Sequence, residues 1–230
     1  QPKKFYEKGQ TLKLVHNITP WRGLNVLLAA MHFLEDEDIT LDVYSSTQIY
    51  WDSFKEANDK YYQPIYDHAK SMKKVNFKGY APHEEVLQAL QDSHVFAYPS
   101  IWEETSCNSA IEAMAAGCAA LVTNFGALFE TCSDYGFYVN YNNVPKQLAI
   151  DYSQHIKAAI RKQHGKSALK KAYSIKYLKR ILPQQDIKTR LTNQRQHFLH
   201  FYDWDQRIKE WIAFLNNGLM KKGIPHEDGK

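Results

Sequence analysis

The chain has few of the residues that build disulfide frameworks or zinc sites. Its three cysteines are Cys107, Cys118 and Cys132, and no two of them form a CxxC pair. Three cysteines cannot all pair within one chain, and nothing in their spacing resembles a disulfide scaffold or a cysteine-rich metal centre. The cysteine content therefore argues against a disulfide-stabilised secreted domain and favours a reducing compartment.

Long apolar segments are also missing. No apolar run approaches the ~20 residues that a helix needs to cross a bilayer, and residues 1–4 lack the apolar stretch of a signal peptide. Repeats and low-complexity tracts are absent too. We therefore expect a folded cytoplasmic protein, whose contact with a membrane, where there is one, is peripheral.

The excess of positive charge is small, and it is concentrated in one segment. The net charge is only +4, which does not by itself indicate nucleic-acid binding. Residues 157–180 nevertheless hold nine Lys or Arg and no Asp or Glu. This run is typical of a solvated helical face, and a contact with an anionic membrane surface or an acidic partner is the alternative. Nucleic acid is disfavoured, because Tyr173 and Tyr177 are the only aromatic residues in the run.

The first two thirds of the sequence alternate short apolar runs with amphipathic segments. The alternation predicts an α/β domain with a parallel sheet covered by helices on both faces. The expected strands cover residues 12–15, 39–44, 75–77, 94–98, 119–122 and 137–139. The expected helices cover residues 23–33, 52–70, 83–90 and 108–116, the last of them closed by Gly117.

The strand pattern stops after about residue 142. We therefore predict an α/β domain over residues 1–143, a helical segment over 144–217 that packs on it, and a flexible tail over 218–230. Pro183 is the clearest break in the helical segment, and Trp204 and Trp211 are expected to anchor its terminal helices.

Residues 98–117 carry the most informative pattern. A predicted strand ends in a loop rich in Thr, Ser and Asn, and a short helix follows. In an open α/β sheet, ligands bind at this end of the strands, and the free N–H groups at a helix N-terminus suit a diphosphate. Glu104 precedes the helix and Glu112 lies within it, with seven residues between them. Each carboxylate can accept two hydrogen bonds from the paired hydroxyls of a sugar or ribose.

This stretch resembles the E-x7-E signature of the retaining glycosyltransferases of GT-B fold that are usually called family 4. Further blocks are similar to that family in the same order, so the resemblance extends over roughly residues 11–215. These blocks are residues 20–28, 75–80, 115–130 and 202–211. The resemblance implies a Rossmann-like sheet that forms the C-terminal half of a GT-B enzyme.

The resemblance also implies a role for each matching residue. Glu112 would bind the ribose hydroxyls, Glu104 the hydroxyls of the donor sugar, and Arg22, which precedes Gly23, would neutralise the leaving diphosphate. The other residues implied to hold the donor are Ser106, Cys107 and Asn108, through their N–H groups, and Gly79 and Tyr80 at the base.

The implied reaction transfers a sugar from a nucleotide-diphosphate sugar to an acceptor with retention of configuration. Fixed donors and a guanidinium would stabilise the charge that develops on the diphosphate, so no metal and no cofactor beyond the donor are expected. Asp203 and Asp205 have the spacing of a DxD motif, but we expect them on the surface of the terminal helices. Cys107 lacks an evident His partner, so we do not expect a nucleophile there.

The sequence departs from the family pattern at two places. Residues 16–19 lack the further basic residue that the first β–α turn usually carries, and Thr105, Ser106 and Cys107 replace the commoner glycine-rich run. We expect the acceptor wall on an N-terminal domain or a separate partner chain. The alternatives are an inactive nucleotide-sugar-binding module, a sugar epimerase of GT-B fold, and a basic interaction protein that uses residues 157–180.

Overall fold

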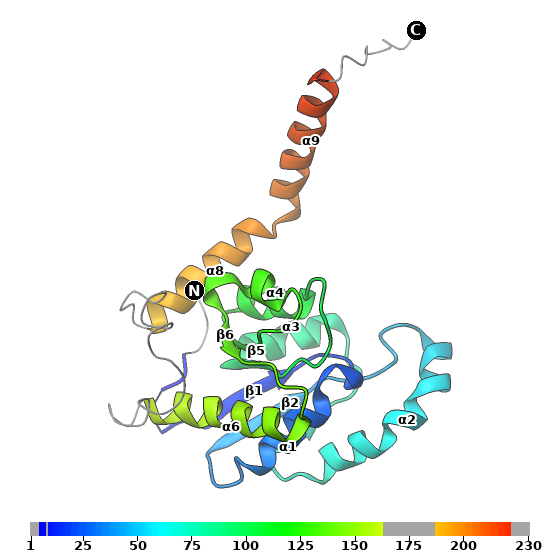
Figure 1. Ribbon diagram of the computed structural model, residues 1–230, viewed down its shortest axis with the longest axis vertical. Coiled ribbons are helices and arrows are strands. Elements are labelled where there is room, and N and C mark those ends of the chain that lie inside the picture. Colours follow the sequence, from blue (N-terminus) through cyan, green and yellow to red (C-terminus); the bar gives the residue numbers. More distant parts are fainter. Residues whose placement is uncertain (1–4, 8, 163–186, 222–230) are drawn as a thin grey trace.

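The computed structural model describes residues 5–7, 9–162 and 187–221. Six parallel strands form one sheet in the order β3-β2-β1-β4-β5-β6, and the predicted α/β fold is confirmed (Figure 1). The strands are β1 Leu12–His16, β2 Ile39–Val43, β3 Val75–Phe77, β4 Val95–Tyr98, β5 Ala119–Thr123 and β6 Phe137–Val139. Each pairs in parallel with its neighbours, as strands joined through helices do.

Helices cover both faces of this sheet (Figure 1). Successive residues of a strand point to opposite faces, so Leu14 belongs to one apolar core and Val15 to the other. The Leu14 core is closed by α1 (Leu24–His32) and α6 (Pro145–Lys162), and by the end of α2 (Asp52–Ser71). The Val15 core is closed by α3 (His83–Asp92), α4 (Asn108–Ala116), α5 (Leu128–Cys132) and α8 (Ile187–Phe201). Because both faces of the sheet are covered, several strands are continuous apolar runs in the sequence instead of alternating apolar and polar residues.

Helix α4 has the bounds that the sequence predicts. Its last turn is closed by Gly117 in the left-handed conformation, with φ of +100°, which a residue without Cβ adopts at little cost. Three short elements were not predicted, namely the 3-10 helices Pro20–Arg22 and Ser133–Tyr135, and helix α5.

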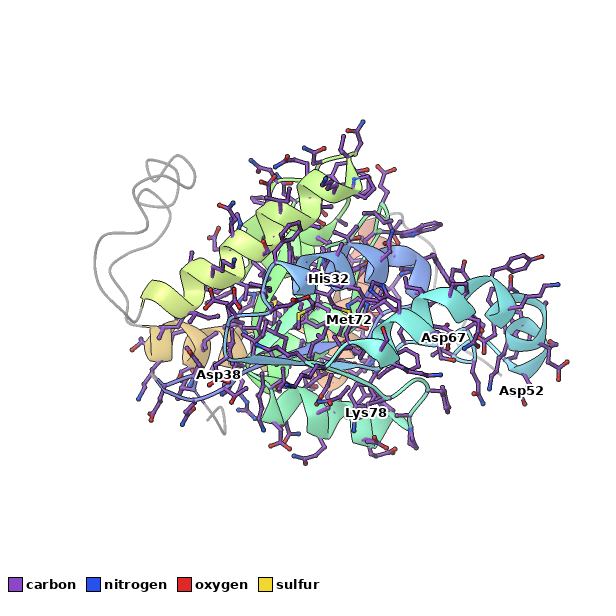
Figure 2. The ribbon with its side chains drawn as sticks, turned by 90° about the horizontal axis from the view of Figure 1, so that it is seen from below. His32, Asp38, Asp52, Asp67, Met72 and Lys78 are labelled. Carbon is purple, nitrogen blue, oxygen red and sulfur yellow. The ribbon has the colours of Figure 1, made fainter. Side chains whose placement is uncertain are left out.

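Helix α2 has its fully buried side chains only near its C-terminal end. Of its 20 residues, Tyr66 and Ala69 are the buried ones. In Figure 2 the labelled Asp52 lies far out from the body, whereas Asp67 lies nearer to it. The first turns of α2 therefore stand out beside the carboxyl end of the sheet.

The two C-terminal helices differ in how they contact the domain. In α8, Phe198 is buried and the Gln194 amide donates to the carbonyls of Met114 (3.1 Å) and Cys118 (2.8 Å). Helix α9 (Trp204–Lys221) instead extends away from the domain (Figure 1). The predicted anchoring by Trp204 and Trp211 is wrong, because these side chains are 77% and 62% exposed and the helix projects instead of packing.

Helix α9 continues to Lys221, whereas the sequence predicted a flexible tail from residue 218. Pro183 and all of the basic run after residue 162 lie outside the described residues. Within the described part of the chain, no helix is both long and apolar enough to cross a membrane.

Candidate functional site

The candidate site lies where the strand order reverses. Strand β1 pairs with β2 on one side and with β4 on the other. The chain therefore leaves β1 towards one edge of the sheet and leaves β4 towards the other edge. The loops that follow these two strands at their carboxyl ends carry the residues of interest. Residues 17–23 follow β1, and residues 99–107 follow β4.

The two loops touch at Gly23. The Ile101 N–H donates to the Arg22 carbonyl (3.3 Å), and a Cβ on Gly23 would lie only 2.3 Å from the Pro99 carbonyl oxygen. Gly23 also has φ of +132°, which side-chain-bearing residues rarely adopt. Glycine is therefore required here for the β1 loop to pack against the β4 loop.

Arg22 and Glu104 form an ion pair across this junction. The Arg22 Nη1 lies 3.0 Å from Glu104 Oε1 and 3.1 Å from Oε2, and the Tyr98 hydroxyl donates to Oε1 at 2.6 Å. The Glu104 side chain is only 4% exposed, whereas the Arg22 side chain is 26% exposed. The guanidinium thus bridges a buried carboxylate and the surface of the site.

The charges of this group are mutually stabilising. Burial, the largest single effect, would lower the pKa of Arg22, but the facing Glu104 carboxylate together with Tyr98 and Tyr50 raises the pKa above its usual value. Burial, together with the hydrogen bond to Glu104, raises the pKa of Tyr98 far above its usual value, so the phenol stays a hydrogen-bond donor. The Arg22 guanidinium also lies over the Trp102 ring, 5.5 Å from its centroid.

The loop after β5 fixes the backbone of Glu104. The Ala127 N–H donates to the Glu104 carbonyl (2.7 Å), and a Cβ on Gly126 would lie 2.5 Å from the Glu104 nitrogen. Loops from β1, β4 and β5 therefore all converge on this one glutamate.

Helix α4 begins directly after this junction. The N–H groups of Ser106, of the N-cap residue Cys107 and of the first helical residue Asn108 donate to no described residue, as is usual where a helix begins. Ser106 and Asn108 are exposed, and Cys107 is buried. Three unpaired donors at a helix N-terminus make a site for an anion. Burial raises the pKa of the Cys107 thiol to about 12, which agrees with the expectation that it is no nucleophile.

Glu112 lies one turn further along α4 and pairs with His83 at the start of α3. The His83 Nε2 is 3.0 Å from Glu112 Oε1, and the Glu112 side chain is 33% exposed. This contact connects Glu112 to the turn of Gly79 and Tyr80, where Gly79 has φ of +71° and Tyr80 is 52% exposed.

Most of the predicted site residues are thus brought into two neighbouring groups. Arg22, Gly23 and Glu104 meet at the β1–β4 junction, and Glu112 is held by His83, which follows the turn of Gly79 and Tyr80 in the chain. Helix α4 joins the groups, because its first turn follows Glu104 and Glu112 lies on its body. No group of three or more His, Cys, Asp or Glu residues suited to a metal ion occurs among the described residues.

Sequence reasoning missed three partners of these residues. They are Tyr98, Trp102 and His83. Tyr98 and Trp102 lie within the E-x7-E stretch, so an aromatic residue close to a buried carboxylate was a usable signal. His83 lies 29 residues from Glu112, and only the packing of α3 on α4 brings the two together.

His16 is the first residue of the segment 16–19, in which the sequence lacks a further basic residue, and it supplies no cation itself. It is fully buried at the end of β1, and its Nδ1–H donates to the Ala97 carbonyl (2.9 Å). Burial lowers the pKa of His16 to about 4 despite that hydrogen bond. The side chain is therefore neutral at pH 7.

This low pKa predicts a dependence of stability on pH. The unfolded chain gains a proton on His16 below about pH 6.5, and the folded protein gains it only near pH 4. The contribution of neutral His16 is complete above pH 6.5 and is lost as the pH falls towards 4, by up to about 3 kcal/mol. Urea unfolding of wild type and His16→Gln at pH 7 and pH 4.5 measures this, with exposed His68→Gln as control. Equal pH dependence in all three proteins would contradict the assignment to His16.

Together, the sheet order and the β1–β4 junction define a Rossmann-like α/β domain with the candidate site in the loops at the switch point. The family model described as "Glycosyl transferases group 1" matches residues 1–180. The chain belongs to this family, which confirms the resemblance found in the sequence. A search of curated proteins gave no significant match.

Solved structures share the fold at low sequence identity. A glycosyltransferase from Rickettsia africae is 18% identical, with a TM-score of 0.54 over 86% of this chain and 49% of its own. An α,α-trehalose 6-phosphate synthase from Burkholderia multivorans is 11% identical, with a TM-score of 0.60 over 96% of this chain and 45% of its own. The E. coli structure titled "Trehalose-6-phosphate", bound with UDP-2-fluoro glucose, is 9% identical, with a TM-score of 0.57 over 94% and 45%. This chain spans about half the length of these proteins.

Proposed function

We propose that this chain is the donor-binding half of a retaining glycosyltransferase and binds a nucleotide-diphosphate sugar. The observation that carries the proposal is the arrangement around α4. Unpaired N–H groups at and just before its N-terminus lie between Glu104 and Glu112 along the chain, and Arg22 pairs with Glu104. Anion donors flanked by a carboxylate on each side match a diphosphate that carries ribose at one end and a sugar at the other.

The diphosphate is placed at the N-terminus of α4. Breaking the bond between the anomeric carbon and the phosphate leaves an additional charge on the diphosphate, which Arg22 and the N–H groups near Ser106 would stabilise. Arg22 suits this role because its position is already fixed by Glu104 and by the Trp102 ring. In this proposal the diphosphate oxygen takes the acceptor proton on the same face, so the configuration is retained.

The ribose and the base are placed further along α4. The Glu112 carboxylate has lone pairs left after its contact with His83, and it is exposed enough to accept hydrogen bonds from ribose hydroxyls. The exposed Tyr80 and the turn at Gly79 lie next to His83 in the chain, and they form the surface for the base.

The sugar is placed towards Glu104, which can accept few further hydrogen bonds. Both carboxylate oxygens already accept from Arg22, and Oε1 also accepts from Tyr98, so little acceptor capacity remains. A sugar hydroxyl would take the remaining lone pair and add to this network.

Glu104→Gln tests this placement. An amide keeps the size of the side chain but cannot pair with Arg22 as a carboxylate does. If Glu104 contacts the sugar in addition to fixing Arg22, the nucleotide sugar should lose about tenfold more affinity than the bare nucleoside diphosphate. Calorimetry on both ligands measures the difference. Equal losses would mean that Glu104 acts only by positioning Arg22.

The transfer reaction is proposed to need a second wall. The matched structures are about twice as long as the aligned region, and α9 presents large apolar side chains to solvent that another domain can cover. These are Trp204, Ile208, Trp211, Ile212, Phe214 and Leu215. We therefore expect the purified chain to bind donor but to transfer almost no sugar until an acceptor-binding half is added, because rate depends on holding both reactants in place.

One observation favours an alternative, a nucleotide-sugar-binding module without catalysis. His16 is neutral, so the first β–α turn carries Arg22 as its single cation toward the diphosphate. A chain that binds donor and stays inactive with every acceptor-binding half would be such a module.

A further inference from the structure

Two histidines from different helices meet at the end of α1 that lies away from the candidate donor site. His32 is the last residue of α1, and His68 lies in the last turn of α2. The His32 Nε2 lies 3.0 Å from the His68 Nε2, and the ring centroids are 5.2 Å apart. In Figure 2 the labelled His32 lies close to Met72, the residue at which α2 has just ended. The two rings therefore face each other through their Nε2 atoms.

A carboxylate on the far side of one ring places its hydrogen. The Glu35 Oε1 lies 3.1 Å from the His32 Nδ1, so the Nδ1–H donates to this carboxylate. A neutral imidazole has only one N–H group, and the His32 Nε2 therefore presents a free lone pair to His68. Metal-binding histidines usually have such a carboxylate behind them, because it orients the ring and raises its basicity. His32 is thus arranged as a metal ligand is.

The separation of the two Nε2 atoms is close to that of two ligands on one metal ion. Zinc binds imidazole nitrogen at about 2.0–2.1 Å, and two such bonds at a tetrahedral angle hold their nitrogens about 3.3–3.4 Å apart. The observed 3.0 Å is therefore only a few tenths of an ångström too short. Both histidines are exposed, so a small rotation of either side chain admits the ion, and water can fill the remaining coordination positions.

The electrostatic surroundings of the pair favour a cation. His32 and His68 both lie in the last turn of their helices. The C-terminal end of a helix carries a partial negative charge and stabilises a cation nearby. Two such ends converge at the facing Nε2 atoms, and the Glu35 carboxylate adds a full negative charge behind His32. A positive ion between the rings would therefore be stabilised by both helices.

We propose that His32 and His68 form a binding site for a divalent transition-metal ion, with zinc as the representative, which joins α1 to α2. Imidazole nitrogen suits zinc and its neighbours among the transition metals, whereas magnesium and calcium prefer oxygen ligands. In the bound state both Nε2 atoms are ligands, and His68 carries its hydrogen on Nδ1. The hydrogen can move between the two nitrogens of His68 through solvent, because the side chain is exposed.

The metal site is separate from the proposed donor site and would act on the attachment of α2. Helix α1 begins next to Gly23, and its nine residues carry the chain about 13 Å to His32. Nucleotide binding at the N-terminus of α4 is therefore independent of this ion. The buried side chains of α2 are Tyr66 and Ala69, so the ion would fasten α2 near the end that already packs on the domain.

Calorimetric titration of the chelator-treated chain with zinc chloride tests the proposal. We expect one ion per chain, and no competition from magnesium chloride. His32→Gln and His68→Gln should each weaken zinc binding by at least about tenfold, because the loss of a mere outer partner of a ligand already costs that much. Glu35→Gln should keep the site and weaken it about tenfold. The matched control is His200→Gln, which removes an exposed histidine of α8 and should leave the affinity unchanged.

NMR of the histidine rings in the wild-type chain locates the ion without any substitution. Zinc should shift the ring nitrogen signals of His32 and His68 and leave those of His200 in place. Equal melting curves of all variants in the absence of metal would show that the substitutions leave the fold intact. The site is refuted if zinc does not bind to the wild type, if the shifts fall on other histidines, or if binding persists undiminished in His32→Gln and His68→Gln.

Discussion

Glu112→Ala is expected to remove most of the affinity for any nucleotide donor. The carboxylate would hold two ribose hydroxyls, and hydrogen bonds to a charged group contribute about 1.5–3 kcal/mol each. Loss of both should weaken nucleoside diphosphate binding by roughly a hundredfold or more. The nucleotide sugar should lose affinity to the same degree, because both ligands carry the ribose. Isothermal titration calorimetry of wild type and variant measures this directly.

His83→Ala is the control for this prediction. It removes the partner of Glu112 (3.0 Å) but keeps the carboxylate, so the affinity should fall far less than in Glu112→Ala. Glu84→Ala, at an exposed carboxylate of α3, should have no effect. Equal affinities of wild type and Glu112→Ala would overturn the assignment of the ribose.

Arg22→Ala is expected to lower stability as well as donor affinity. It leaves Glu104, whose side chain is 4% exposed, with Tyr98 as its remaining side-chain partner. Removing one member of a buried pair costs about 3–5 kcal/mol, and the lower end applies because Arg22 itself is 26% exposed. About 3 kcal/mol should lower the melting temperature by roughly 6–12 °C in a chain of this size.

Two further variants test whether the loss of stability comes from the unpaired buried Glu104 or from the loss of any ion pair. Arg207→Ala breaks an exposed pair with Glu210 on α9 and should cost less than about 1 kcal/mol. The double variant Arg22→Ala with Glu104→Gln should regain most of the stability, because no buried charge is left unpaired. If the double variant is as unstable as Arg22→Ala, the ion pair is not what holds the junction.

The sheet could be predicted from the sequence because its strands are short apolar runs that alternate with segments of helical periodicity. All six expected strands are present, with ends that differ by at most one residue. The chemical pattern around Glu104 and Glu112 was equally visible, because both residues lie in one segment of the chain. The family match confirms the class of protein that this pattern indicated.

Contacts between distant segments could not be predicted in this way. The pairing of Arg22 with Glu104 joins residues 82 positions apart, and the pairing of His83 with Glu112 joins residues 29 apart. The sequence assigned Arg22 and Glu104 to different parts of the donor, whereas the fold packs their loops together through Gly23. Local periodicity says nothing about which carboxylate a guanidinium will meet.

The error over α9 has a similar origin. Trp204 and Trp211 recur at a helical spacing, and such a pattern predicts a buried face. The pattern does not say what covers that face, and within the described part of the chain nothing does. We propose that the exposed aromatic side chains of α9 are covered by the second half.

The most direct test of the central claim is a binding titration of the purified chain with UDP-, GDP- and ADP-sugars, followed by NMR of the backbone amides. We predict that at least one donor binds, and that the largest shifts fall on Ser106, Cys107 and Asn108, with further shifts near Gly79 and Arg22. Binding should need no added metal ion. If no nucleotide sugar binds, or if the shifts fall away from the N-terminus of α4, the proposed donor site is contradicted.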